Sequence, residues 1–165
     1  MTAVLIAVCS WISVPAPVPF TLQTFAVFCA LELLGGARGT AAVAVYLLLG
    51  AVGLPVFSGF GGGAGYLLGA TGGYLLGFLL TGLVYWAFER LGNGLWLRVA
   101  ALLLGLALCY AFGTLWFMRV YARGGGAVSL LTALGWCVFP FILPDLGKLA
   151  LALLLARRVK PLLKK

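Results

Sequence analysis

Long apolar runs, separated by short clusters of glycine, proline or charged residues, divide this chain of 165 residues. Apolar runs of this length predict helices that end where glycine or proline follows. We expect six helices, over residues 2–14, 21–35, 40–54, 72–91, 96 to about 120, and Pro144 to about 158. A further apolar stretch, 127–139, precedes Pro140 and Pro144, and Pro144 suits the first turn of the sixth helix. The pattern predicts a single all-α domain over residues 1–165.

The composition indicates whether these helices lie in water or in a lipid bilayer. Hydrophobic residues make up 64% of the chain and charged residues only 8%, and the mean hydropathy is +1.19. Soluble domains carry about a quarter charged residues, so this chain could not cover its core with polar surface in water. We therefore expect an integral membrane protein with six transmembrane helices, although several runs are shorter than the roughly 20 residues of an upright span.

The formal net charge of +8 is concentrated near the C-terminus. A basic tail after the last apolar run marks the cytoplasmic side of a membrane. The tail consists of Arg157, Arg158, Lys160, Lys164 and Lys165. With six spans, both termini are then cytoplasmic. No aromatic or folded nucleic-acid-binding module accompanies the tail, so we expect a lipid bilayer and no nucleic acid as partner.

Two charges, Asp145 and Lys148, stand inside the apolar run FILPDLGKLALALLLARR. Their spacing places them on one face of the sixth helix, at its external end. In one interpretation Asp145 caps the helix and Lys148 neutralises it. In the other, a charged pair at membrane depth marks a polar ligand site. Only one other carboxylate, Glu32, lies within a span away from a cytoplasmic end, which favours the ligand site.

The remaining chemistry favours binding over catalysis. The chain has no histidine, and its four cysteines lie isolated in apolar runs, as buried thiols do. The GGGAG segment lacks the GK[ST] of a phosphate-binding loop. We expect no catalytic residue, no metal ligand and no cofactor, and the protein is not predicted to be an enzyme.

Two further segments fall on the external side with the charged pair. They are PVPFTLQTF (17–25), before the second helix, and AGYLLGATGGYLLGF (64–78), which leads into the fourth. Their polar side chains are Thr21, Gln23, Thr24, Tyr66, Thr71 and Tyr74. Each residue could be a cap or an interfacial aromatic, yet together with the charged pair they have the composition of a small-molecule pocket.

These motifs carry a resemblance to a known family. PVPFTLQTFAV, YLLLGAVGLPVFSG, GATGGYLLGF and the final D-x-x-K occur in the order found in the BioY family, and the likeness covers residues 2 to about 155. BioY proteins are the biotin-specific substrate-binding (S) subunits of energy-coupling-factor (ECF) transporters. The resemblance implies an ECF S-component-like bundle that captures biotin from outside. It also implies partners, namely a transmembrane coupling subunit and two cytoplasmic ATPases.

The resemblance also implies roles for particular residues. Asp145 and Lys148 match the family's ligand-contacting pair, and Lys148 could meet either the ureido ring or the carboxylate of biotin. The other substrate-binding candidates are Gln23, Thr24, Tyr66, Thr71, Gly72, Gly73 and Tyr74. In the first helix, Ala3 and Ala7 match the small-residue spacing that meets the coupling subunit in such transporters.

Two departures from the family pattern lie beside the expected pocket. Ala70 stands where proline is expected before TGGY, and Leu143-Pro144 where Pro-Gly is frequent before the aspartate. The alternatives are an S-subunit for riboflavin or thiamine, which would share the architecture without these motifs, or a small membrane enzyme or channel.

Overall fold

The computed structural model describes residues 1–14, 19–124, 126 and 128–163. Pro17 and Val18 of the first external segment, and Lys164 and Lys165 of the basic tail, lie outside these ranges. The helices are α1 (Thr2–Trp11), α2 (Gln23–Leu34), α3 (Gly36–Ala51), α4 (Ala64–Leu67), α5 (Gly72–Glu89), α6 (Leu95–Arg123), α7 (Leu130–Cys137) and α8 (Phe139–Leu163). A 3₁₀ turn, η1 (Ser58–Phe60), precedes α4. The prediction of a mostly helical protein is confirmed.

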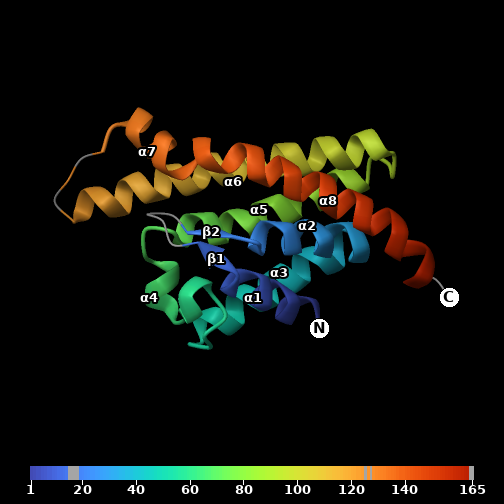
Figure 1. Cartoon of the computed structure of the whole chain (residues 1–165), viewed down its shortest axis with the longest axis horizontal. Coiled ribbons are helices and arrows are strands. Elements are labelled where there is room, and N and C mark those ends of the chain that lie inside the picture. Colours follow the sequence, from blue (N-terminus) through green and yellow to red (C-terminus); the bar gives the residue numbers. More distant parts are fainter. Residues whose placement is uncertain (15–18, 125, 127, 164–165) are drawn as a thin grey trace.

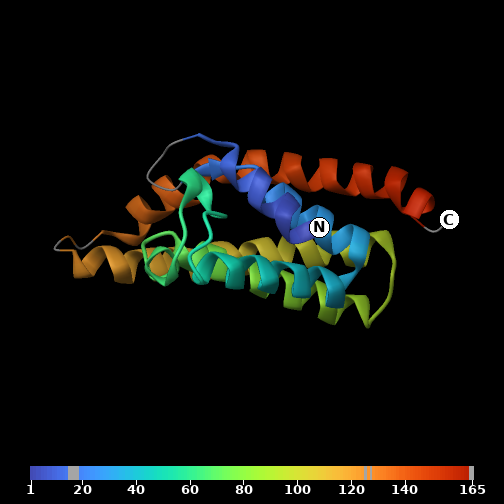
Figure 2. The ribbon, with the colours of Figure 1, turned by 90° about the horizontal axis from the view of Figure 1, so that it is seen from below.

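The long helices α6 and α8 run lengthwise through the molecule, and α7 joins them at one end (Figure 1). The C-terminal end of α8 lies at the opposite end (Figures 1 and 2). In the part of the chain that the structure describes, two segments are long and apolar enough to cross a membrane, Leu95–Arg123 and Leu130–Leu162. Three further apolar helices, α1, α2 and α3, are shorter. By length and composition these apolar helices agree with a helical membrane protein.

Small residues allow α5 and α6 to pack closely along their length. At four places a glycine of one helix lies against a side chain of the other, where a Cβ atom would overlap it. The pairs are Gly73 with Trp116, Gly77 with Cys109, Gly105 with Thr81, and Gly113 with Tyr74. Helices in lipid associate by such packing, because lipid tails are as apolar as the side chains and the hydrophobic effect does not drive the helices together.

The chain between α1 and α2 forms a short antiparallel ladder that the apolar pattern did not predict. Strand β1 (Ser13–Val14) pairs with β2 (Phe20–Thr21), with Ser13 opposite Thr21. The first helix ends at Trp11 rather than at residue 14 for this reason. The ladder brings Phe20 and Thr21 to the start of α2.

Helix α3 begins at Gly36, directly after α2, and not at residue 40 as expected. Gly35 adopts a φ of 82°, which turns the chain within one residue. Glu89 of α5 then accepts a hydrogen bond of 2.7 Å from the free backbone N–H of Gly36. A single glycine and a distant carboxylate thus replace the expected loop.

The start of the last helix also differs from the prediction. Helix α8 begins at Phe139, and Pro144 lies inside it instead of at its first turn. Proline there removes one hydrogen bond to the carbonyl of Pro140, a loss that packing of the helix tolerates. Asp145 is therefore well inside the helix, and the interpretation of Asp145 as an N-terminal cap is wrong.

A buried carboxylate joins the helices at the end opposite to α7. Glu32 of α2 is fully buried and accepts hydrogen bonds from the hydroxyl of Tyr85 at 2.9 Å and from Arg98 at 3.0 Å. Lys160 of α8 lies 4.0 Å from the same carboxylate. The network links α2, α5, α6 and α8 through one charged centre.

We predict that Glu32→Gln destabilises the protein, because it leaves the Arg98 guanidinium without its buried counter-charge. Breaking a buried pair by removing one partner costs about 3 kcal/mol or more. The matched control is Glu89→Gln, which weakens only a charge at the N-terminus of α3, worth about 1 kcal/mol. Thermal unfolding in detergent measures both. Equal losses in the two variants would contradict a special role for Glu32.

Candidate functional site

A cavity lies between α2, α5, α6 and α8, near the end of the molecule where α7 is found. Its volume is about 70 Å³, which is several times the roughly 10–15 Å³ that one water molecule needs. Its wall is formed by Pro19, Thr21, Gln23, Thr24, Ser58, Tyr66, Thr71, Tyr74, Leu75, Phe78, Leu106, Cys109, Tyr110, Cys137, Phe141, Asp145 and Lys148. Apolar walls with a few polar groups suit a small organic ligand.

Asp145 and Lys148 form a buried ion pair in this wall. The Lys148 ammonium lies 2.7 Å from Oδ1 of Asp145, and the two residues are 7% and 3% exposed. Lys148 also donates a hydrogen bond of 2.6 Å to the backbone carbonyl of Thr21. The pair therefore belongs to the interior of the protein and not to its surface.

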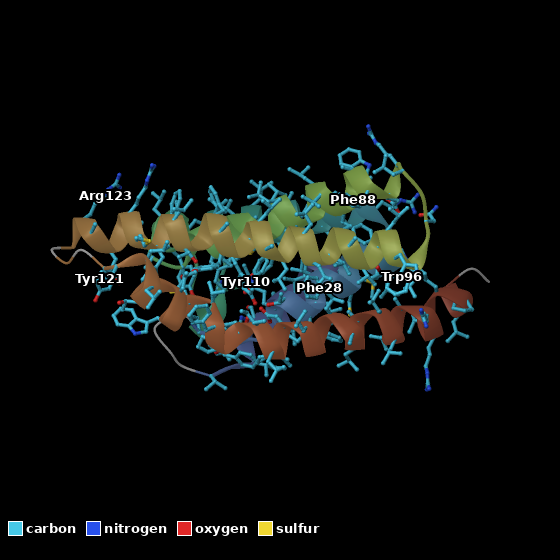
Figure 3. The ribbon with its side chains drawn as sticks, turned by 90° about the horizontal axis from the view of Figure 1, so that it is seen from above. Phe28, Phe88, Trp96, Tyr110, Tyr121 and Arg123 are labelled. Carbon is cyan, nitrogen blue, oxygen red and sulfur yellow. The ribbon has the colours of Figure 1, made fainter. Side chains whose placement is uncertain are left out.

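Tyr110 of α6 holds the other oxygen of the same carboxylate. Its hydroxyl donates a hydrogen bond of 2.6 Å to Oδ2 of Asp145, and Figure 3 shows Tyr110 on the side of α6 that faces α8. Each Asp145 oxygen thus has one donor, a lysine from its own helix and a tyrosine from the neighbouring one. This contact fixes the carboxylate in the cavity wall.

An aromatic ring covers the ammonium group, and a second ring packs behind the first. The Nζ atom of Lys148 lies 4.1 Å from the ring centroid of Phe20, a cation–π geometry. The ring of Phe20 stacks on that of Phe141, with centroids 6.0 Å apart. The short ladder before α2 therefore covers the charged pair on one side.

The start of α2 contributes the amide of Gln23 and the hydroxyl of Thr24, both in the wall and both buried. The Gln23 amide donates a hydrogen bond of 2.8 Å to the hydroxyl of Tyr46 in α3. Tyr46 in turn donates a hydrogen bond of 3.1 Å to the carbonyl of Val56. Gln23 is thus held from behind by a residue outside the cavity.

On the opposite wall, Tyr66, Thr71 and Tyr74 come together as the sequence predicted. The hydroxyl of Tyr66 donates to the carbonyl of Ser58 at 3.1 Å. The hydroxyl of Tyr74 is 3.0 Å from that of Thr114. Both phenols therefore have protein partners and present mainly their rings to the cavity.

Gly72 and Gly73 lie next to these residues but are not in the cavity wall. Both are buried at the start of α5, and a Cβ atom would overlap the carbonyl of Leu67 at Gly72 and the side chain of Trp116 at Gly73. The structure thus gives these glycines a packing role. Their position does not support the predicted contact with substrate.

The two alanines of α1 lie away from the cavity. Ala7 is 4% exposed and belongs to the buried core, while Ala3 is half-buried against it. The large exposed side chains of α1 are Val4, Leu5, Val8 and Trp11. The contact predicted for Ala3 and Ala7 with a coupling subunit would therefore require α1 to move from its place in this structure.

Sequence reasoning missed Tyr110, Tyr46 and Phe20. Each is a single aromatic residue in an apolar run, and aromatic residues are common in such runs for packing and interfacial reasons alone. A partial signal exists for Tyr110, which follows the wall residues Leu106 and Cys109 at helical spacing. Only the contact with Asp145 distinguishes it from the other aromatic residues of α6.

Within the described residues, no group of histidine, cysteine, aspartate or glutamate side chains could hold a metal ion. Cys109 and Cys137 reach the cavity wall as free thiols. The arrangement supplies one carboxylate, one ammonium, one amide and several hydroxyls, which can bind a neutral polar group by charge-assisted hydrogen bonds.

Comparison with known proteins identifies the family. The model of the BioY family matches residues 1–165. The chain belongs to the BioY family. It is 43% identical over 159 residues to the biotin transporter BioY of Thermotoga maritima, covering 96% of this chain and 90% of that protein. It is 38% identical to a probable biotin transporter BioY of Pyrococcus horikoshii, covering 87% and 82%.

A solved structure of the same kind supports the BioY fold. The crystal structure of an S-component for biotin from an ECF-type ABC transporter matches with a TM-score of 0.84 at 29% identity. The match covers 97% of this chain and 87% of that one. The resemblance to BioY found in the sequence is confirmed, and the BioY chain is a transporter component rather than an enzyme.

We predict that Gly73→Ala in this BioY chain lowers thermal stability, because the new methyl group would overlap Trp116. Overpacking of this kind costs about 1–3 kcal/mol. The control is Gly147→Ala, since Gly147 is exposed in α8 and a Cβ there meets no atom. Alanine should stabilise that helix by up to about 1 kcal/mol. Thermal unfolding of both variants checks this, and an unchanged melting temperature for Gly73→Ala would contradict the packing role.

Proposed function

We propose that this chain is the biotin-binding S subunit of an ECF-type transporter and takes part in biotin uptake. The observation that carries the proposal is the buried pair of Asp145 and Lys148 in the wall of an otherwise largely apolar cavity. Relatives named biotin transporter BioY, and a structural neighbour described as the S-component for biotin, supply the ligand class.

The chemistry of biotin matches the cavity. Biotin has a ureido ring with two N–H donors and one carbonyl acceptor, an apolar thioether ring, and a carboxylate on an aliphatic chain. A carboxylate only accepts hydrogen bonds and an ammonium only donates them. Asp145 can therefore accept from a ureido N–H, while Lys148 donates to the ureido carbonyl or to the ligand carboxylate. The walls formed by Leu75, Phe78 and Leu106 suit the thioether ring.

The pair also explains why a charge-poor chain keeps two charges here. Burying an ion pair costs desolvation that mutual attraction does not reliably repay, so such a pair is weak support for stability alone. In a membrane protein, ionisable side chains inside the protein mark ligand or ion sites. A bound ligand with complementary donors and acceptors would form hydrogen bonds with both charged groups.

We extend the proposal to the placement of the chain in the membrane. It spans a bacterial plasma membrane six times, with both termini in the cytoplasm and the cavity facing outside. The basic residues Arg157, Arg158 and Lys160 near the end of α8, remote from the cavity, support this orientation. Attaching a reporter that is active only in the cytoplasm to either terminus tests it.

The proposed partners are a transmembrane coupling subunit and two cytoplasmic ATPases. The description of the structural neighbour as part of an ECF-type ABC transporter supports partners of this type. A coupling subunit would meet the chain within the membrane, and a close approach through Ala3 and Ala7 would require α1 to leave its place against the core.

We predict that the purified protein binds biotin and not thiamine or riboflavin. The carboxylate, the ammonium and the apolar wall of the cavity suit the ureido and thioether rings, and neither thiamine nor riboflavin has a carbonyl flanked by two N–H groups. Isothermal titration in detergent, with each vitamin in turn, measures this. Binding of thiamine or riboflavin in place of biotin would overturn the ligand assignment.

We predict that Asp145→Asn and Lys148→Ala each weaken biotin binding by about a hundredfold, since each leaves a buried polar partner unmatched at a cost of about 3 kcal/mol. The matched control is Leu146→Ala, which changes an exposed side chain between them on the same helix. Wild-type affinity in both charge variants would show that the pair serves the fold and not the ligand.

A further inference from the structure

The hydrogen bonds behind the cavity determine which atom of Gln23 faces the ligand. Gln23 lies in the cavity wall and is 4% exposed. One end of its amide is 2.8 Å from the hydroxyl of Tyr46. The other end has no hydrogen-bond partner in the part of the chain that the structure describes. The amide could expose either its oxygen, which would accept a hydrogen bond from a ligand donor, or its NH₂ group, which would donate one to a ligand acceptor.

The hydroxyl proton of Tyr46 settles this choice. Tyr46 is fully buried, and its oxygen lies 3.1 Å from the backbone carbonyl of Val56. A carbonyl can only accept, so the hydrogen bond between the phenol and Val56 uses the single proton of the phenol, and the second lone pair of this carbonyl accepts from Ser10 at 2.6 Å. The phenol then offers only a lone pair to Gln23, and the amide group next to it must be the NH₂. The amide oxygen is left toward the cavity.

We infer that Tyr46 is a positioning residue that sets the specificity of the cavity through Gln23. By holding the NH₂ group, it fixes the amide so that the Gln23 oxygen accepts a hydrogen bond from a ligand N–H. The inference rests on the proposed function, in which that N–H belongs to the ureido ring of biotin. Asp145 is an acceptor as well, so the cavity presents two acceptors to a ligand with two N–H donors.

The position of Tyr46 suits this role. It touches no ligand space itself, since it is absent from the cavity wall. Its ring packs edge-on against Phe57, with centroids 5.5 Å apart, so the hydroxyl cannot move without repacking the core. A buried amide held on one side by a fixed partner rejects a ligand that lacks the matching donor.

A double-mutant cycle tests the coupling. Tyr46→Phe keeps the ring and removes only the hydroxyl, so it should weaken biotin binding about tenfold by freeing the amide to turn. Gln23→Ala should weaken binding by a similar factor, and the double variant should bind like Gln23→Ala alone. Additive losses would overturn the inference, because they would show that Tyr46 acts independently of Gln23.

The control for the cycle is Ser10→Ala. Ser10 donates a hydrogen bond of 2.6 Å to the same Val56 carbonyl and lies beside the Tyr46 hydroxyl, but no hydrogen bond joins it to Gln23 in the part of the chain that the structure describes, so Ser10→Ala leaves the Tyr46–Gln23 contact in place. Its removal should leave biotin affinity unchanged. A loss equal to that of Tyr46→Phe would show that the Val56 segment, and not the amide orientation, matters to the ligand.

A spectroscopic measurement on the wild-type protein avoids variants altogether. Gln23 is the only glutamine in the sequence, so glutamine labelled with ¹³C at Cδ and ¹⁵N at Nε2 reports on this amide alone. Adding biotin should shift the ¹³C signal of the carbonyl and leave the ¹⁵N signal nearly unchanged. The reverse pattern would overturn the inference while leaving biotin binding intact. Failure of wild-type protein to bind biotin in the same titration would instead contradict the proposed function.

Discussion

The Lys148 ammonium can be buried only because three different parts of the chain surround it. Asp145 supplies the counter-charge, the carbonyl of Thr21 accepts a hydrogen bond, and the face of Phe20 covers it. Since an unpaired charge in an apolar interior costs several kcal/mol, α8 and the chain before α2 must hold this arrangement together. The cavity lies beside this arrangement, which makes one side of its wall polar.

The other helices place partners for this centre. Close packing of glycines brings α6 against α5 and presents Tyr110 to Asp145. At the far end of the bundle, Glu32 of α2 binds Tyr85 of α5 and Arg98 of α6. These contacts join helices that also form the cavity. Two buried carboxylates, one toward each end, therefore each have hydrogen-bond partners on more than one helix. One faces a ligand space, while the other is enclosed by protein.

Sequence predicted the helical fold and most of the polar residues in the cavity wall, because apolar runs and polar residues beside them are local features. It failed where long-range contacts decide the outcome. The early start of α8 depends on packing that tolerates Pro144 inside a helix, and the direct passage from α2 to α3 depends on Glu89. Tyr46 and Tyr110 are ordinary aromatic residues in sequence, and only their hydrogen bonds reveal a role. At Gly72 and Gly73 a motif position predicted ligand contact, and close packing is a second reason for a glycine that the sequence alone does not reveal.

The central claim is that the chain keeps Asp145 and Lys148 for a ligand and not for stability. The most direct test replaces both with leucine, and Tyr110 with phenylalanine so that no hydroxyl loses its acceptor, and measures, in one preparation, the thermal stability without ligand and the affinity for biotin. Apolar residues in place of a buried pair are often neutral or stabilising, so the account predicts an unchanged or higher melting temperature and no detectable biotin binding. A large loss of stability together with wild-type biotin affinity would contradict it.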